Sequence, residues 1–129
     1  MSEPNPKDYR YLESHEWHKR EPDGTISIGI TQHAADELDQ VTFVDLPKVG
    51  RQIAKGQSWG IIESHKASND LYSGVSGTIV AVNEELGKSP EIVNAEPFTR
   101  GWMIKVKPSN PAEFDQLLSA EDYEKTIAH

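Results

Sequence analysis

The sequence contains no cysteine among its 129 residues. This absence excludes a disulfide scaffold, Cys-ligated zinc and a cysteine nucleophile, and leaves thiol redox chemistry only to an attached cofactor. No apolar run approaches the roughly 20 residues that span a bilayer. The first residues also lack the apolar stretch of a secretory signal and the arginines of a mitochondrial transit peptide. We therefore expect a bacterial cytoplasmic location, with mitochondria as the alternative if a transit peptide has been removed.

Positive charge is scarce as well. Thirteen Lys and Arg residues stand against 21 Asp and Glu residues, which gives a net charge of −8. Binding to nucleic acid or to an anionic membrane surface requires clustered basic residues, so neither partner is expected. The length matches about one domain. We expect residues 1–8, with two prolines and no periodicity, to form a flexible N-terminal arm, and residues 9–129 to form a single domain.

Short runs of alternating apolar side chains dominate the chain. Residues 14–18 and 25–30 predict a hairpin, joined by the turn-forming Glu21-Pro22-Asp23-Gly24. Further strands are predicted over 41–44, 58–64, 77–82 and 102–106, with 77–82 as the partner of 58–64. A helix capped by Thr31 is predicted over 32–38, and others near 90–94, after Asn110 and after Ser119. These elements predict a mostly β sandwich or flattened barrel with short peripheral and C-terminal helices.

Motifs for a self-sufficient enzyme are missing. His15-Glu16-Trp17-His18 lacks the spacing of the His-Glu-x-x-His zinc motif, and on a strand its two histidines point to opposite faces. The sequence has no phosphate-binding loop, dinucleotide fingerprint or nucleophile elbow. We therefore expect no catalytic residue and no metal site, and predict that the protein is not itself an enzyme.

One lysine is distinguished by its surroundings. Lys66 lies in the polar stretch from Ser64 to Asp70, between two apolar segments. We expect it at an exposed hairpin tip, where a modifying enzyme could reach its amine. Glu63 and Asp70 flank it, three residues before and four residues after, and neither need form a competing ion pair. Composition alone does not separate Lys66 from the other lysines, since most of the nine lysines are expected to be solvated surface groups.

The order of motifs along the chain distinguishes Lys66 from the other lysines, which composition alone does not. Glu63-Ser64-x-Lys66-Ala67 is followed by Asp70 and then by Val75-Ser76-Gly77. In this arrangement the chain resembles the glycine cleavage system H proteins, over about residues 9–126. The resemblance also includes the segments Ser14–Trp17, Ile28–Thr31, Val41–Pro47, Val49-Gly50, Glu91–Asn94, Gly101–Val106 and Tyr123.

The resemblance implies a lipoyl/biotinyl-type β-sandwich (a barrel-sandwich hybrid) with lipoate covalently attached to Lys66. It implies a carrier of glycine catabolism and one-carbon metabolism. The carrier takes the aminomethyl group of glycine from the pyridoxal-phosphate-dependent glycine decarboxylase (P protein) to the folate-dependent aminomethyltransferase (T protein). Dihydrolipoamide dehydrogenase (L protein) then reoxidises the arm, and a lipoate ligase or lipoyl transferase attaches the lipoate. A monomer is expected.

By the same resemblance, Ser14, Glu16 and Asp70 line a surface groove for the aminomethyl-bearing arm, and Glu63 and Asp70 flank the attachment site. A carboxylate in the groove would accept a charge-assisted hydrogen bond from the ammonium group. Excluding water there would protect the labile cargo. The strand pattern independently places Ser14 and Glu16 on one face. In the alternative interpretation, Glu16 is an exposed strand carboxylate and Asp70 stabilises the turn.

Several positions depart from the family pattern. His65 replaces a small apolar residue, and Gly74 replaces a common proline and is expected to loosen the turn. Glu37 stands where some members have a histidine facing the groove, and Asp39-Gln40 replaces a Gly-Asp or Gly-Glu pair. Two alternatives stay open: an H-like paralogue that acts as a lipoyl relay donor or scaffold, and an unmodified binding module. A lipoyl or biotinyl domain of a larger complex is disfavoured, because such domains lack the C-terminal helices.

Overall fold

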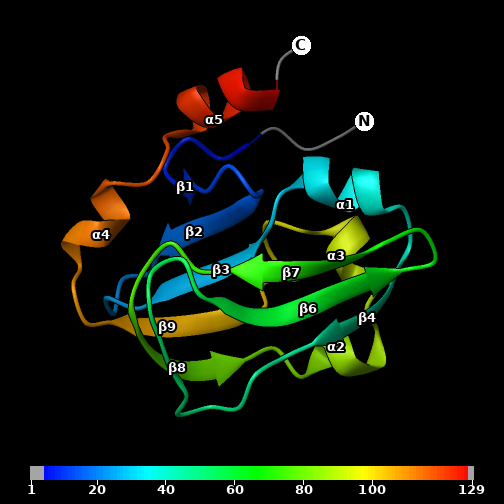
Figure 1. Ribbon diagram of the computed structural model, residues 1–129, viewed down its shortest axis with the longest axis horizontal. Helices are drawn as coiled ribbons and strands as arrows, with labels where there is room; N and C mark the ends of the chain where they lie inside the picture. Colours follow the sequence, from blue (N-terminus) through cyan, green and yellow to red (C-terminus); the bar gives the residue numbers. More distant parts are fainter. Residues whose placement is uncertain (1–4, 128–129) are drawn as a thin grey trace.

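The computed structural model describes residues 5–127, which form two antiparallel β-sheets with short helices around them (Figure 1). The first sheet has the strand order β1-β2-β3-β9-β8-β5, and the second has the order β4-β6-β7. The strands are β1 Arg10–Tyr11, β2 Glu16–Arg20, β3 Ile26–Ile30, β4 Val41–Asp45, β5 Gln52–Ile53, β6 Ser58–Ser64, β7 Ser68–Tyr72, β8 Gly77–Val82 and β9 Ile104–Pro108. The helices are α1 Gln32–Leu38, α2 Glu85–Lys88, α3 Ile92–Ala95, α4 Ala112–Asp115 and α5 Ala120–Ile127.

The predicted class is confirmed, because strands dominate and the helices are short and peripheral. The hairpin predicted over residues 14–30 is also confirmed as β2 and β3, which pair from Glu16 with Ile30 to Arg20 with Ile26. Within this hairpin Trp17 packs over Gly29, where an added Cβ would lie 2.7 Å from the indole. No helix within residues 5–127 combines the length and the apolar content that crossing a membrane requires.

Apolar side chains from both sheets form the main core. The three isoleucines of β3 are all buried, together with Trp59 and Ile62 of β6. A second cluster surrounds Trp17 and lies between β1, β2 and α5; Tyr11 and Tyr123 stack in it with ring centroids 4.8 Å apart. Burying these rings fixes the C-terminal helix against the strand that leads into the functional site.

The predicted partner of residues 58–64 is wrong. β6 pairs with β7 and β4, whereas β8 lies in the six-stranded sheet between β5 and β9. β7 escapes prediction because it is an edge strand whose first three residues are polar and exposed, and only Leu71 is buried. A strand with one buried side chain has no alternating pattern to recognise.

Smaller differences concern the ends of elements. β2 and β9 begin two residues later than predicted, so the half-buried Trp102 precedes its strand, and the short helix α2 was not expected. The caps are confirmed: the Thr31 hydroxyl accepts the N–H of Ala34 at 3.3 Å, and the Ser119 hydroxyl accepts the N–H of Asp122 at 3.1 Å. Within the described residues, α2, α3 and α4 begin without a side-chain cap bond, and α4 starts from Pro111 rather than from Asn110. A polar cap therefore marks the start of α1 and α5 only.

Part of the predicted flexible arm is attached to the body. The Tyr11 hydroxyl donates to the carbonyl of Pro6 at 2.6 Å, and the Asn5 amide donates to Glu124 of α5 at 3.2 Å. Residues 1–4 of that arm lie outside the described residues.

The turn after β7 is held firmly, so the expectation that Gly74 loosens it is wrong. Gly74 is buried, and its N–H donates to Nε2 of His18 at 3.0 Å. Burial lowers the pKa of His18 to about 3, so the ring is neutral and can accept this bond. The neighbouring Ser73 hydroxyl donates to the carbonyl of Val75 at 2.6 Å.

We predict that a proline at position 74, the residue that the resemblance implies for the family, destabilises this chain. Gly74→Pro removes the N–H that His18 accepts, and a Cβ at this position would lie 2.4 Å from Leu117. An unsatisfied buried acceptor costs about 1–3 kcal/mol, so the urea midpoint should fall. Gly87→Ala, where an added Cβ meets nothing within 4 Å, is the control and should leave the midpoint unchanged or raise it. Equal midpoints for the wild type and Gly74→Pro would contradict this account.

Candidate lipoyl site and arm groove

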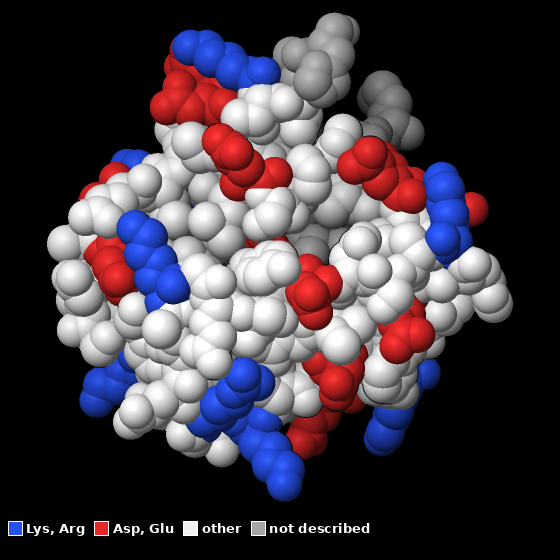
Figure 2. Space-filling model, in the orientation of Figure 1, with Lys and Arg blue, Asp and Glu red and all other residues white. Residues whose placement is uncertain are grey.

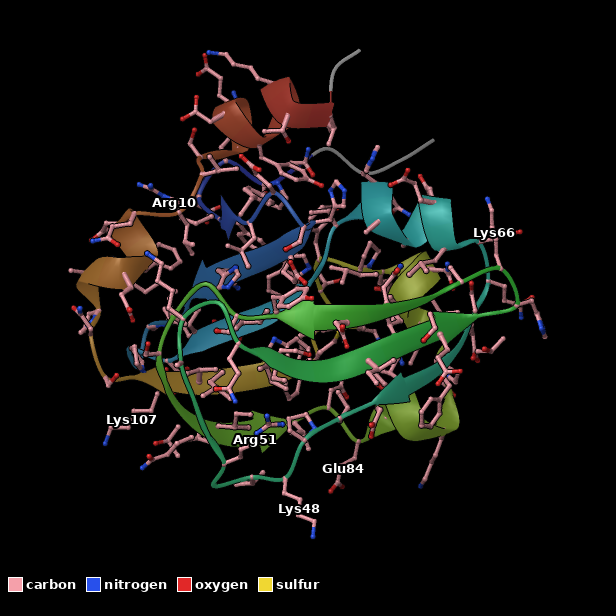
Figure 3. All side chains as sticks on the ribbon, in the orientation of Figure 1. Arg10, Lys48, Arg51, Lys66, Glu84 and Lys107 are labelled. Atoms are coloured by element: carbon pink, nitrogen blue, oxygen red, sulfur yellow. The ribbon has the colours of Figure 1, made fainter. Side chains whose placement is uncertain are left out.

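The hairpin of β6 and β7 presents Lys66 at its tip. Glu63 and Ser68 are the last paired residues, and Lys66 is exposed in the turn beyond them. Figure 3 shows its side chain at the outer end of the hairpin, pointing away from the sheets. None of the ion pairs within residues 5–127 involves Lys66. Its amine is therefore accessible to another protein.

Ser64 gives the turn a fixed shape. Its hydroxyl accepts the N–H groups of Lys66 and Ala67, each at 3.1 Å, and its own N–H donates to the carbonyl of Ala67 at 2.8 Å. Within residues 5–127, the side-chain hydrogen bonds of this turn come from Ser64. The alternative interpretation, in which Asp70 stabilises the turn, is therefore wrong. A modifying enzyme would meet a preformed loop rather than a flexible strand of chain.

A groove of about 560 Å³ runs from the hairpin tip toward β2. It lies between β7, α1 and the loop before β2. In the view of Figure 2, acidic side chains lie near the middle of this face, while the basic ones stand mainly at its margin. The groove residues include Ser14, His15, Glu16, Ile30, Ala34, Glu37, Leu38, Ile62, Ala67, Ser68, Asp70, Leu71 and Tyr72.

Glu16 is a buried carboxyl group at this groove, with 1% of the residue exposed. The Ser14 hydroxyl donates to one carboxylate oxygen at 2.5 Å, and the Tyr72 N–H donates to the other at 2.8 Å. Burial nevertheless outweighs these two bonds and raises the pKa of Glu16 to about 7. The prediction that Ser14 and Glu16 share a face is confirmed, and the alternative of an exposed carboxylate is wrong.

The two acids that flank the lysine have different surroundings. Asp70 pairs with Ile61 across the hairpin and lines the groove with an exposed side chain. Glu63 is exposed on β6 opposite Phe43 and does not line the groove. The structure therefore brings Asp70, Ser14 and Glu16 to one cavity and leaves Glu63 outside it.

Apart from Gly74, the residues that depart from the family pattern lie at the hairpin tip and on or just after α1. His65 is exposed beside Lys66, and Glu37 lines the groove from α1 and pairs with His33 at 3.1 Å. Asp39 ends α1 with a φ of 65°, a left-handed value that favours glycine. This backbone geometry accounts for the glycine that the resemblance implies at this position.

Comparison with known proteins agrees with this geometry. The model of the glycine cleavage H-protein family matches residues 9–129. The chain belongs to the glycine cleavage H-protein family. The glycine cleavage system H protein of Opitutus terrae is 50% identical over 122 residues, which cover 95% of this chain and 96% of that protein. The relative of the same name from Carboxydothermus hydrogenoformans is 53% identical over 123 residues, covering 95% and 93%.

The fold agrees with a solved H protein. A crystal structure of a glycine cleavage system H protein from Mycobacterium marinum superposes with a TM-score of 0.88 at 34% identity, covering 95% of this chain and 98% of that one. The lipoyl-type β-sandwich is thereby confirmed. The chain is a lipoyl carrier of the glycine cleavage system and not a catalyst, and proteins of this family carry lipoate on a lysine. Membership of that system implies that its other components are the partners of this chain in general. The relatives do not favour the alternative of a lipoyl relay donor or scaffold.

The raised pKa of Glu16 predicts a pH-dependent stability. Between about pH 4.5 and 7 the folded protein retains a proton that the unfolded chain has released. The contribution of this group to stability is therefore full below about pH 4.5 and is lost as the pH rises to about 7. The loss is on the order of 3 kcal/mol.

Glu16→Gln should remove this pH dependence, because an amide does not titrate. The free energy of unfolding of both proteins is measured in urea at about pH 4.5, 6 and 8. The other titrating groups are the same in the two proteins, so their contributions cancel in the difference between the two free energies. We expect the wild type to lose stability relative to the variant as the pH rises. Parallel stability curves would mean that Glu16 ionises in the folded protein as it does in the unfolded chain.

Proposed function

We propose that Lys66 is the lysine that carries lipoate, and that the groove beside it receives the arm when the arm bears the aminomethyl group of glycine. One observation carries the proposal: an accessible lysine stands at a structured hairpin tip, and the groove begins at the next two residues, Ala67 and Ser68. An arm attached at this lysine is thereby tethered next to its own docking site, which raises its effective concentration there.

The groove suits a lipoyl-lysine arm in chemistry as well as in place. Its volume of about 560 Å³ lies within the range of small-molecule clefts. Ile30, Leu38, Ile62 and Leu71 give it apolar walls, and amide formation would leave the arm without the lysine charge. When attached, lipoate supplies the thiol and the redox couple that a cysteine-free chain lacks.

Glu16 is suited to hold the ammonium group of the cargo. Its carboxyl group is buried and fixed by Ser14 and by the backbone of Tyr72. A cation nearby favours the charged form of a carboxylate, so an ammonium group would lower the pKa of Glu16 from its value of about 7. The resulting contact is a charge-assisted hydrogen bond shielded from water. Asp70, exposed at the same cavity, adds negative charge.

We further propose that the carrier is a bacterial cytoplasmic monomer that docks in turn on the decarboxylase (P protein), the aminomethyltransferase (T protein) and the dihydrolipoamide dehydrogenase (L protein). A lipoate ligase or lipoyl transferase would act on Lys66. The net charge of −8 supports steering toward basic rims on these enzymes. The large apolar side chains exposed within residues 5–127 are Phe43, Val49 and Val80, too few to require a permanent partner.

Lipoylation in vitro tests the assignment of Lys66. The unmodified chain is incubated with lipoate, ATP and a lipoate ligase, and intact mass and lysine-resolved peptide mapping are measured. We expect one lipoyl group, on Lys66, and complete loss of modification in Lys66→Arg. Lys55→Arg, a matched change at another exposed lysine, should be modified like the wild type.

A lipoyl group on another lysine, or undiminished modification of Lys66→Arg, would overturn the assignment. If the wild type takes up no lipoate, His65→Val in the same assay identifies the cause. Modification of that variant at Lys66 would locate the defect in recognition of His65, and its absence would also overturn the assignment.

A further inference from the structure

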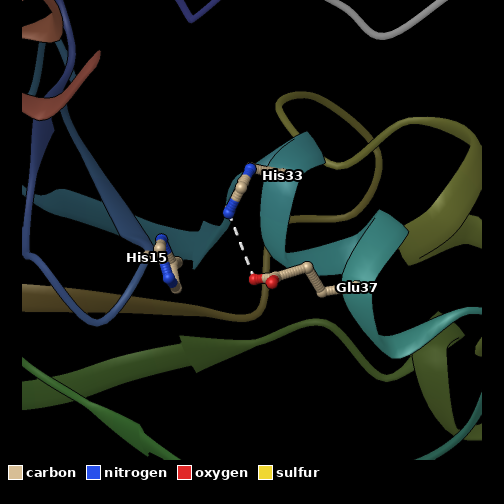
Figure 4. A group of neighbouring side chains, drawn as sticks. All are labelled: His15, His33 and Glu37. Carbon is tan, nitrogen blue, oxygen red and sulfur yellow. Dashed lines mark ion pairs between the residues drawn. The ribbon is translucent and has the colours of Figure 1, made fainter. Parts of the chain in front are cut away.

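Three potential metal ligands converge beside the groove without belonging to the lipoyl hairpin. His15 lies in the loop before β2, and His33 and Glu37 lie one turn apart on α1 (Figure 4). Each offers one ligand atom, and these three atoms lie within 4.8 Å of one another. The pair considered in the sequence, His15 and His18, does not meet, because His18 is buried against Gly74.

The geometry needs only small side-chain movements to close on an ion. Nε2 of His33 already lies 3.1 Å from a carboxylate oxygen of Glu37, and the rings of His15 and His33 have centroids 4.9 Å apart. A tetrahedral ion with bonds of about 2.0–2.1 Å holds its ligand atoms about 3.3 Å apart. Because the side chains of His33 and Glu37 are 36% and 62% exposed, they have room to make this adjustment.

His15 has the support that metal-binding histidines usually have. Its Nδ1 lies 2.7 Å from the hydroxyl of Tyr123, and that hydroxyl lies 2.8 Å from the hydroxyl of Thr31. Metal-bound imidazoles commonly use their second nitrogen in such a hydrogen bond, which fixes the ring and its tautomer. Nε2 of His15 is then the nitrogen left for a metal. The residue also has a φ of 81°, in the left-handed region that few non-glycine residues adopt.

We propose that His15, His33 and Glu37 form a binding site for one divalent transition metal ion of the zinc type. Two imidazoles with one carboxylate match the preference of Zn²⁺ and its neighbours, whereas Mg²⁺ and Ca²⁺ prefer oxygen ligands. Three protein ligands leave at least one coordination position for water or for another donor.

The site lies at the boundary of two cavities. His15 and Glu37 line the arm groove, and together with His33 they also line a second cavity of about 330 Å³. Glu13 lines that second cavity as well and adds negative charge. A bound ion would therefore stand in the wall of the groove. The proposed site requires no lipoate and is independent of the assignment of Lys66.

Calorimetric titration of the unmodified chain, without a histidine tag, tests the site with Zn²⁺ and with Mg²⁺. We expect one Zn²⁺ per chain and no saturable uptake of Mg²⁺. His33→Ala and Glu37→Gln, on exposed positions of α1, should each weaken Zn²⁺ binding at least about 10-fold. His65→Ala removes an exposed histidine outside the cluster and should bind like the wild type.

Histidine-ring NMR in the same titration distinguishes this site from non-specific uptake. The ring signals of His15 and His33 should shift, and those of His18 and His65 should stay in place. The proposal is overturned if the wild type shows no saturable Zn²⁺ uptake, if both α1 variants keep its affinity, or if the shifts occur at His65 instead. Circular dichroism confirms that each variant is folded before it is titrated.

Discussion

The buried carboxyl group of Glu16 joins the two sheets at the place where the arm would dock. Glu16 begins β2 in the six-stranded sheet, and one of its oxygens accepts the N–H of Tyr72 at the end of β7 in the other sheet. A buried charge is costly unless it has hydrogen-bond partners. Ser14 and Tyr72 provide them, yet the pKa still rises to about 7. The carboxyl group of Glu16 therefore links the two sheets, and a cation bound beside it would stabilise its charged form.

The remaining parts of the site are arranged around this carboxyl group. β7 connects it to the hairpin tip, where Ser64 fixes the turn that exposes Lys66. On the other side, the loop before β2 is held by the bond between His15 and Tyr123 of α5. The C-terminal helix, far away in sequence, thus helps to shape one wall of the groove. On our proposal, one small carrier combines an attachment point, a groove for the tethered arm and an acceptor for the ammonium group of its cargo.

Local signals in the sequence predicted much of this structure. Alternation gave the β2–β3 hairpin, the polar cap Thr31 gave the start of α1, and a polar stretch between apolar segments placed Lys66 at a tip. Features that depend on tertiary contacts were not accessible: β7 has too few buried residues to show a pattern, and the burial of Glu16 depends on elements distant in sequence. The proximity of His15 to His33 was also not predictable from the sequence, because it too depends on contacts between elements distant in sequence.

Retention of the cargo by the lipoylated protein tests the role of Glu16 most directly. The protein is lipoylated, loaded with glycine by the decarboxylase and purified, and spontaneous release of ammonia is then followed. Glu16→Gln should release it roughly 10-fold faster than the wild type, because a charge-assisted hydrogen bond of about 1.5 kcal/mol is lost. Glu63→Gln, at an exposed carboxylate outside the groove, should behave as the wild type. Equal release from the Glu16 variant and the wild type would contradict the account.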